Sequence, residues 1–269
     1  MSVDIDIAVE KSADGKWIRE RVPARVPDSE TFELANSPMI VRGLAADDHI
    51  RLADDGQFEL ITWGRNVAIQ VFGEWGEVDA LAQHVAALGG RLDGKEPRMR
   101  VFTVPLSVGI HTIEETIDRV VADWPKLSWM FGNLTTIDLL AGHDETGEPV
   151  VESLHAFAHS DGTFELLVSP LLVSGVASGD HVALGTDATF EVTARNGNLA
   201  VQTLGDWEIE FFAPRVVELG GRLDGDAGGQ AAAFTFPGSI EIDSIRALFD
   251  GEAASNPDRT WRIANDEAA

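Results

Sequence analysis

A stretch of 22 residues occurs twice in this chain, and this duplication limits the possible folds more than any other feature of the sequence. Thr31–Leu52 and Thr163–Leu184 are identical at 12 of 22 positions without a gap, at an offset of 132 residues. Leu88–Gly94 and Leu219–Gly225 share the sequence LGGRLDG at an offset of 131. Two copies are too few for a solenoid. The chain is therefore predicted to contain two homologous modules, 1–140 and 141–269, with the glycine-rich and acid-rich segment 135–148 as their linker.

Each repeat shows strand alternation, turn signals and two amphipathic helical patterns. Helices are predicted at 78–88 and from Thr112, and Pro214 and the Asp250-Gly251 pair predict shorter helices in the second repeat. The strands expected in the first repeat are 17–26, 32–34, 49–52, 58–63, 67–72, 91–92, 99–104 and 127–131. The order from residue 67 onward is β-α-β-β-α-β, as in the split βαβ unit. Each module is thus predicted to be α+β, a small antiparallel sheet or half-barrel followed by a ferredoxin-like βαββαβ sandwich.

The repeated motifs resemble a known family. A strand with a glutamate precedes Phe-Glu-Leu, a Ser-Pro turn, Gly-Leu-Ala-x-Asp-Asp-His-Ile and a closing tryptophan strand. This pattern is similar to a bacterial domain-of-unknown-function family, DUF4265, over nearly all of both repeats. The resemblance implies the fold and leaves the function open.

The chain is strongly acidic. It has 45 acidic and 20 basic residues, a net charge of −25. Residues 1–140 contain 23 acids and 14 bases (−9), whereas residues 141–269 contain 22 acids and 6 bases (−16). Such a surface repels phosphates, so nucleic-acid binding is not expected, and a basic protein is the partner that it favours. The alternative is that the acidity serves only solubility, as in salt-adapted or high-GC organisms.

Composition excludes several other classes. With no cysteine, disulfides, thiol nucleophiles and cysteine-ligated zinc are excluded. No apolar run reaches the length of a membrane span, and the acidic start does not match a signal peptide. The protein is therefore expected to be cytoplasmic, and the sequence does not indicate whether it self-associates.

Histidines provide the candidates for chemistry. Asp48-His49 and Asp180-His181 recur in the two repeats, but neighbours on a strand face opposite ways, so a structural role at the start of a strand is favoured over a catalytic pair. His155 and His159 share one strand face roughly 13 Å apart, which does not suit a metal ion. No metal, cofactor or catalytic site is therefore predicted, and no common catalytic motif occurs.

Other polar residues recur in both repeats. They are Glu20 and Glu152, Gln70 and Gln202, Asn66 and Asn198, Asn133 and Asn265, and the pairs Arg91/Asp93 and Arg222/Asp224. Polar residues kept in both copies can line a pocket or satisfy buried turns, and the second explanation is favoured. Trp75 and Trp207 each stand between a strand and a helix, where core packing is favoured over an exposed partner anchor.

Three functional hypotheses follow. The first is a non-catalytic acidic binding protein, most concretely an immunity-type or antitoxin-type inhibitor of a basic protein. The residues proposed for its docking surface are Trp207, Glu208, Glu210, Asp224, Asp226 and Trp75. The alternatives are a small-molecule sensor with a ligand at the seam of paired modules, and an enzyme with an unfamiliar site near His49 or His181.

Overall fold

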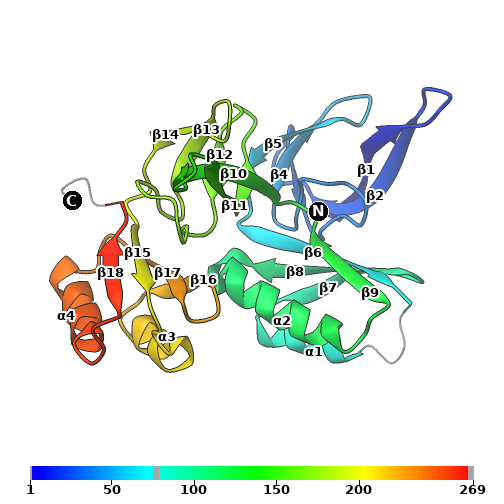
Figure 1. The fold of residues 1–269 in the computed structure, drawn as a ribbon. Helices are drawn as coiled ribbons and strands as arrows, with labels where there is room; N and C mark the ends of the chain where they lie inside the picture. Colours follow the sequence, from blue (N-terminus) through cyan, green and yellow to red (C-terminus); the bar gives the residue numbers. More distant parts are fainter. Residues whose placement is uncertain (1, 75–78, 266–269) are drawn as a thin grey trace. The chain divides into compact units, whose positions relative to one another are not determined.

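The computed structural model describes residues 2–74 and 79–265 (Figure 1). In this part of the chain, four α-helices and four antiparallel sheets form two similar halves. The main boundary between two compact units lies between Leu134 and Thr135. None of the described helices has the length and apolar character needed to cross a membrane.

Each unit begins with a five-stranded antiparallel sheet in which neighbours in sequence are neighbours in space. The strands of the first unit are β1 (Ser2–Lys11), β2 (Trp17–Arg25), β3 (Phe32–Leu34), β4 (His49–Leu52) and β5 (Phe58–Thr62). Those of the second unit are β10 (Thr135–His143), β11 (Pro149–Ala158), β12 (Phe164–Leu166), β13 (His181–Leu184) and β14 (Phe190–Ala194). A loop of 14 residues joins β3 to β4, and an equivalent loop joins β12 to β13.

A four-stranded antiparallel sheet with two helices completes each unit. The elements of the first are β6 (Asn66–Gly73), α1 (Asp79–Ala87), β7 (Arg91–Glu96), β8 (Met99–Pro105), a 3-10 turn (Leu106–Val108), α2 (Ile110–Ala122) and β9 (Leu127–Phe131). Those of the second are β15 (Leu199–Leu204), α3 (Ile209–Glu218), β16 (Arg222–Asp226), β17 (Ala231–Phe236), α4 (Ile242–Ala253) and β18 (Thr260–Ile263). The strand orders are β7-β8-β6-β9 and β16-β17-β15-β18.

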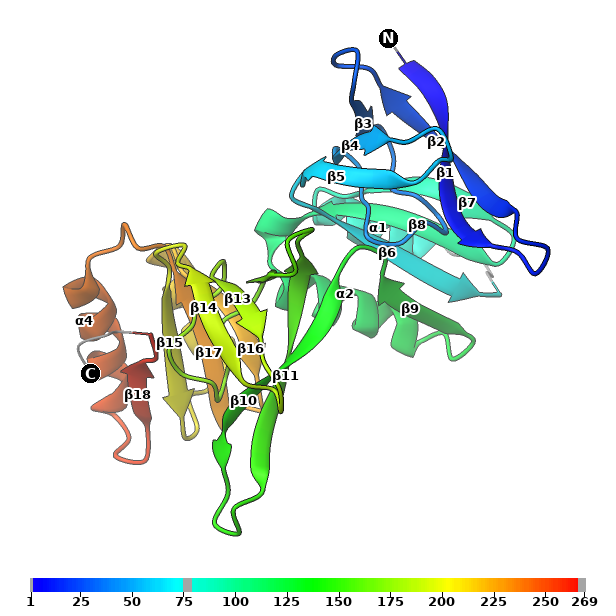
Figure 2. The ribbon, with the colours of Figure 1, turned by 90° about the horizontal axis from the view of Figure 1, so that it is seen from above.

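Strand alternation gives each four-stranded sheet two different faces. In the second unit, Val201 packs with Phe212 of α3 and Phe249 of α4, so the helices cover this face. The next residue along β15, Ala200, instead packs with Ala177 of the β12–β13 loop. The two helices of each unit lie on one side of its four-stranded sheet (Figures 1 and 2). The long loop therefore packs on the helix-free face.

The sequence-based expectations need three corrections. The segment 135–148, predicted as a linker, is β10 and its hairpin turn, so the predicted boundary after residue 140 lies inside a strand. The repeat also includes β1, which precedes the first predicted strand and matches β10. Finally, Pro214 lies inside α3 and Gly251 inside α4, so neither residue ends its helix, and α4 has 12 residues against 13 in α2.

Candidate functional site

The recurring glutamates fix the long loop of each unit. Glu152 accepts hydrogen bonds from three successive backbone N–H groups, those of Leu171 (2.6 Å), Leu172 (2.8 Å) and Val173 (3.1 Å). Glu20 accepts the same three bonds from residues 39–41. Gln202 donates to the carbonyl oxygens of Pro170 and Val173 in the same loop. These side chains satisfy the backbone of a turn, as favoured from the sequence.

Other recurring polar residues also form hydrogen bonds within the fold. Asp224 accepts hydrogen bonds from the backbone N–H of Ser169, the Thr235 hydroxyl and Nε of Arg222. Asp93 has the equivalent bonds in the first unit. Asn133 and Asn265 join the end of their unit to β6 and β15 through paired amide–backbone bonds. These networks hold the long loop and the chain end against the four-stranded sheet, and their polar groups are used within the fold.

In each recurring Asp-His pair, the aspartate is buried and the histidine is partly exposed. Asp48 and Asp180 are completely buried and accept backbone N–H bonds, from Ala45 and Gly64 in the first unit and from Ala177 and Asn196 in the second. His49 and His181 begin β4 and β13 and are partly exposed. Asp48 and Asp180 therefore hold a turn.

Two residues proposed for the docking surface are not available to a partner. Trp207 is completely buried, and its Nε1 donates to the carbonyl oxygen of Leu204. The side chain of Asp224 is 1% exposed because it is enclosed by the network described above. Glu208, Glu210 and Asp226 are exposed. Trp75 lies outside the described residues.

The exposed aromatic residue of this segment is Phe211, four residues after Trp207. Phe211, on the outer side of α3, is 76% exposed, and Val217 on the same helix is 60% exposed. Pro214 is also exposed between them, and Glu210 and Glu218 flank the three apolar residues. We call Glu210, Phe211, Pro214, Val217 and Glu218 the α3 surface. Phe212 and Val216 point the other way into the core, which leaves this surface uncovered by the helix's own unit.

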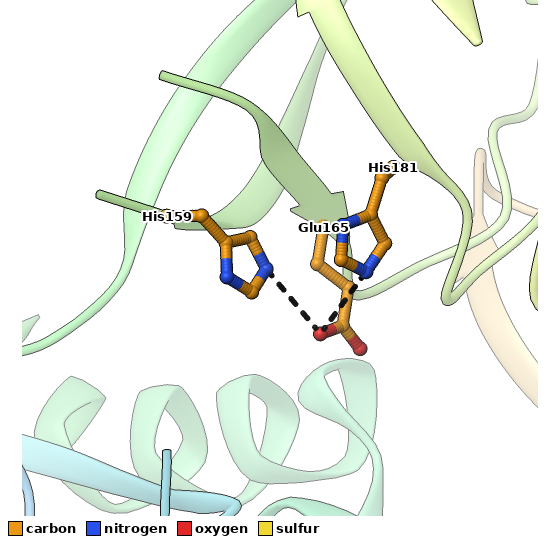
Figure 3. A group of neighbouring side chains, drawn as sticks. All are labelled: His159, Glu165 and His181. Atoms are coloured by element: carbon orange, nitrogen blue, oxygen red, sulfur yellow. Dashed lines mark ion pairs between the residues drawn. The ribbon is translucent and has the colours of Figure 1, made fainter. Parts of the chain in front are cut away.

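A separate cluster of side chains lies on the five-stranded sheet of the second unit. Nε2 of His159 and Nε2 of His181 lie 3.7 and 3.9 Å from the same carboxylate oxygen, Oε2 of Glu165 (Figure 3). The two imidazole rings are stacked, with centroids 4.6 Å apart and planes 18° apart. Glu165 is buried, whereas both histidines are partly exposed. Within the described residues, this is the group of histidine and carboxylate side chains whose ligand atoms could hold a metal ion.

Strand register explains how this cluster forms. Glu165 and His181 are opposite each other in the β12–β13 ladder, and Glu165 is opposite Phe157 in the β11–β12 ladder. His159 follows Phe157 by two residues, so its side chain is directed to the same face, diagonal to Glu165. The spacing of His155 and His159 along one segment of chain could not indicate this cluster, because Glu165 and His181 belong to the neighbouring strands β12 and β13.

Comparison with known proteins identifies the repeated module. The model of a family described as Domain of unknown function (DUF4265) matches residues 20–124 and again residues 152–256. The chain belongs to this family. No curated protein matches it. A solved structure titled "Novel crystal structure of a hypothetical protein from Neisseria gonorrhoeae" is similar at 18% identity and a TM-score of 0.40, covering 49% of this chain and 92% of its own.

The two DUF4265 repeats differ at the cluster. In the first, the equivalent row across the sheet is Arg25, Glu33 and His49, with the Arg25 guanidinium bonded to Glu33. The position of His159 is occupied by Pro27. The second repeat therefore has an additional imidazole beside the glutamate and a phenylalanine in place of the arginine, so only the second repeat brings two histidines to this carboxylate.

Asp48 in the first DUF4265 repeat is expected to make stability depend on pH. Burial raises its pKa to about 7, although hydrogen bonds from Gly64 and Ala45 partly oppose this. Because the folded state then binds the proton more tightly than the unfolded state, the contribution is complete below about pH 4 and is lost as the pH rises to about 7. The unfolding free energy should fall by roughly 1.4 kcal/mol per pH unit in this window. Urea unfolding of the wild type and Asp48→Asn at several pH values measures the effect, and an equal slope in both proteins would contradict it.

Proposed function

We propose that this protein is a non-catalytic, cytoplasmic binding protein that docks a basic protein through the α3 surface, as an immunity-type or antitoxin-type inhibitor would. The observation that carries the proposal is Phe211, an aromatic side chain 76% exposed on a regular helix between two glutamates. Exposed aromatic residues surrounded by polar groups are typical binding hot spots. In this proposal Phe211 is the anchoring residue, the role for which Trp207 was a candidate from the sequence.

Charge supports a basic partner. Residues 141–269 carry a net charge of −16, and acids border the apolar part of the α3 surface at Glu210 and Glu218. Glu208 is held by Arg259, with Nη2 of the arginine 2.9 Å from its carboxylate, so reversing its charge would also break a contact within the fold. Glu210 and Glu218 are therefore the residues that test electrostatic attraction without this complication.

The equivalent helix of the first unit has a different sequence. At an offset of 131, Phe211, Pro214 and Val217 align with Ala80, Gln83 and Ala86 of α1. The buried positions agree between the two helices, because Phe212 aligns with Leu81 and Val216 with Val85, all four of which are buried. The two helices thus differ in sequence at the three apolar positions that are exposed on α3, which favours a role for the second copy that the first does not share.

The test uses immobilised wild-type protein and an extract of the host at low salt. A basic protein should be recovered, and Phe211→Ala should weaken its binding by roughly 30-fold, since a hot-spot residue contributes about 2 kcal/mol. Glu210→Lys with Glu218→Lys should mainly slow association and reduce its dependence on ionic strength. Adding the protein to the purified partner should inhibit the partner's activity.

The matched control is Asp123→Lys, a charge reversal at an exposed position near the end of α2 in the first unit. It should leave both affinity and association rate unchanged. The docking proposal would be abandoned if no basic protein were recovered, or if the partner bound Phe211→Ala and the double lysine variant as well as the wild type.

A second candidate function is small-molecule binding, favoured by a cavity within the second unit. Its volume is about 330 Å³, which is within the range of ligand pockets. Leu171, Leu172 and Leu204 contribute an apolar wall, and Arg262 contributes a cation. This cavity would take an apolar molecule with an acidic group. A regulator of this kind needs no basic partner, so the capture experiment also separates the two candidates.

The finer fold assignment is part of the same proposal. The antiparallel strand orders β7-β8-β6-β9 and β16-β17-β15-β18 support a ferredoxin-like βαββαβ layer in each unit, in which the first and third strands are central. The consecutive pairing of β1 to β5 and of β10 to β14 supports the half-barrel.

A further inference from the structure

We propose that His159, Glu165 and His181 bind one divalent first-row transition-metal ion, with zinc as the favoured ion. Glu165 lies on β12, His181 begins β13 and His159 directly follows the end of β11, whereas the α3 surface belongs to another sheet layer of the unit. The proposal is therefore independent of partner docking, and either can fail without the other.

The donor set suits such an ion. Two imidazole nitrogens and one carboxylate oxygen are the three protein ligands of several catalytic zinc sites. The same set occurs in iron(II) sites with two histidines and one carboxylate. Calcium and magnesium prefer oxygen ligands, so a site with two nitrogen donors disfavours them. Glu165 and His181 come from adjacent strands in fixed register, and His159 directly follows β11, the next strand of the same sheet.

The distances leave room for an ion. The two nitrogen–oxygen separations, 3.7 and 3.9 Å, are longer than a hydrogen bond. Two ligands at zinc bond lengths in a tetrahedral arrangement lie about 3.4 Å apart. All three ligand atoms lie within 4.8 Å of one another, so small side-chain movements suffice to bring them to a common ion.

Exposure of the histidines allows those movements. The two rings are stacked, and the Nε2 atoms of both lie on the side of the Glu165 carboxylate (Figure 3). The side chains of His159 and His181 are 28% and 34% exposed, whereas Glu165 is 7% exposed. The buried carboxylate is thus the fixed ligand, and the partly exposed rings are the ligands that adjust their positions.

The first repeat provides an internal control. Glu33 and His49 occupy the equivalent positions, 3.9 Å apart, but Arg25 is bonded to the glutamate and Pro27 replaces the second histidine. A cation beside the carboxylate and a missing ligand both disfavour metal binding there. Binding is therefore expected at one site per chain, in the second unit.

The experiment is a calorimetric titration of the full chain with Zn²⁺ after treatment with a chelator. One ion per chain should bind, and His159→Gln and His181→Gln should each lower the affinity at least about tenfold, because even residues outside the first ligand shell change metal affinity by about that factor. Zinc should raise the Tm of the wild type and not that of either variant. His49→Gln should bind zinc as the wild type does.

A measurement on the wild-type protein tests the proposal even if the variants fail to fold. Nuclear magnetic resonance of the seven histidine rings should show zinc-induced changes at His159 and His181 first, before His49, His84, His111, His143 or His155. Absence of zinc binding by the wild type overturns the proposal. The proposal is also overturned if the folded His159→Gln and His181→Gln variants bind zinc with the affinity of the wild type. Loss of zinc binding in His49→Gln, or initial ring changes at other histidines, would overturn it as well.

Discussion

Replacing Phe249 by alanine is expected to lower the unfolding free energy of the second unit by about 3 to 5 kcal/mol. Phe249 is completely buried on α4. Its ring lies with centroid distances of 5.0 to 6.0 Å from five other aromatic rings, those of Trp207, Phe212, Phe234, Phe236 and Trp261. The substitution leaves a cavity where α3, α4 and the sheet meet, and rings held by mutual packing cannot close it fully.

Phe211→Ala is the matched control, because it removes the same side chain from the exposed side of α3. Its effect on stability should stay within about 0.5 kcal/mol, as for most surface substitutions. Urea unfolding of both variants, followed by circular dichroism and tryptophan fluorescence, measures the difference. Similar losses for the two phenylalanines would contradict the assigned core, and would also make Phe211→Ala unsuitable for the docking test.

The duplication predicted most of the fold. Two aligned copies supported the same strand and helix order, and the predicted ranges 32–34, 49–52 and 127–131 agree with β3, β4 and β9. The missed strands were β1 and β10, although Ile5 and Ile7, and Ile137 and Leu139, alternate with an aspartate in each copy. In the second copy, the glycines and acids at positions 142–148 obscure this period-2 signal. Gly142 lies within β10, and residues 144–148 form a hairpin turn and not a linker between domains.

The histidine–glutamate cluster could not be predicted from the sequence, because it depends on which strands pair and in which register. His159, Glu165 and His181 are separated by loops, and only the ladder register places Glu165 opposite His181. Spacing along one strand could not supply this pairing, because a register shift by one residue would turn the side chains to the other face. Sequence alone also could not choose which aromatic residue near the start of α3 is buried. Helix phase decides it, with Phe212 and Val216 inside and Phe211 outside.

Glu152→Ala is expected to lower the unfolding free energy of the second unit by roughly 3 to 5 kcal/mol, because three charge-assisted hydrogen bonds are lost together. The carboxylate accepts N–H groups from three successive residues of the β12–β13 loop. Water cannot replace it fully, since two of the donors belong to partly buried groups. Glu191→Ala, at an exposed position of β14, should change stability by less than about 0.5 kcal/mol.

The conservative variant Glu152→Gln separates the loss of charge from the loss of packing. It keeps one acceptor oxygen and the length of the side chain, but its amide group presents a donor to at least one N–H group, so an intermediate loss is expected. Glu20→Ala should have the same effect in the first unit, where the three equivalent bonds are made to residues 39–41. Chemical denaturation with hydrogen exchange of the loop amides measures all of these effects. If loop protection in Glu152→Ala equalled that of the wild type, the carboxylate would not be what holds the loop on the helix-free face of the sheet.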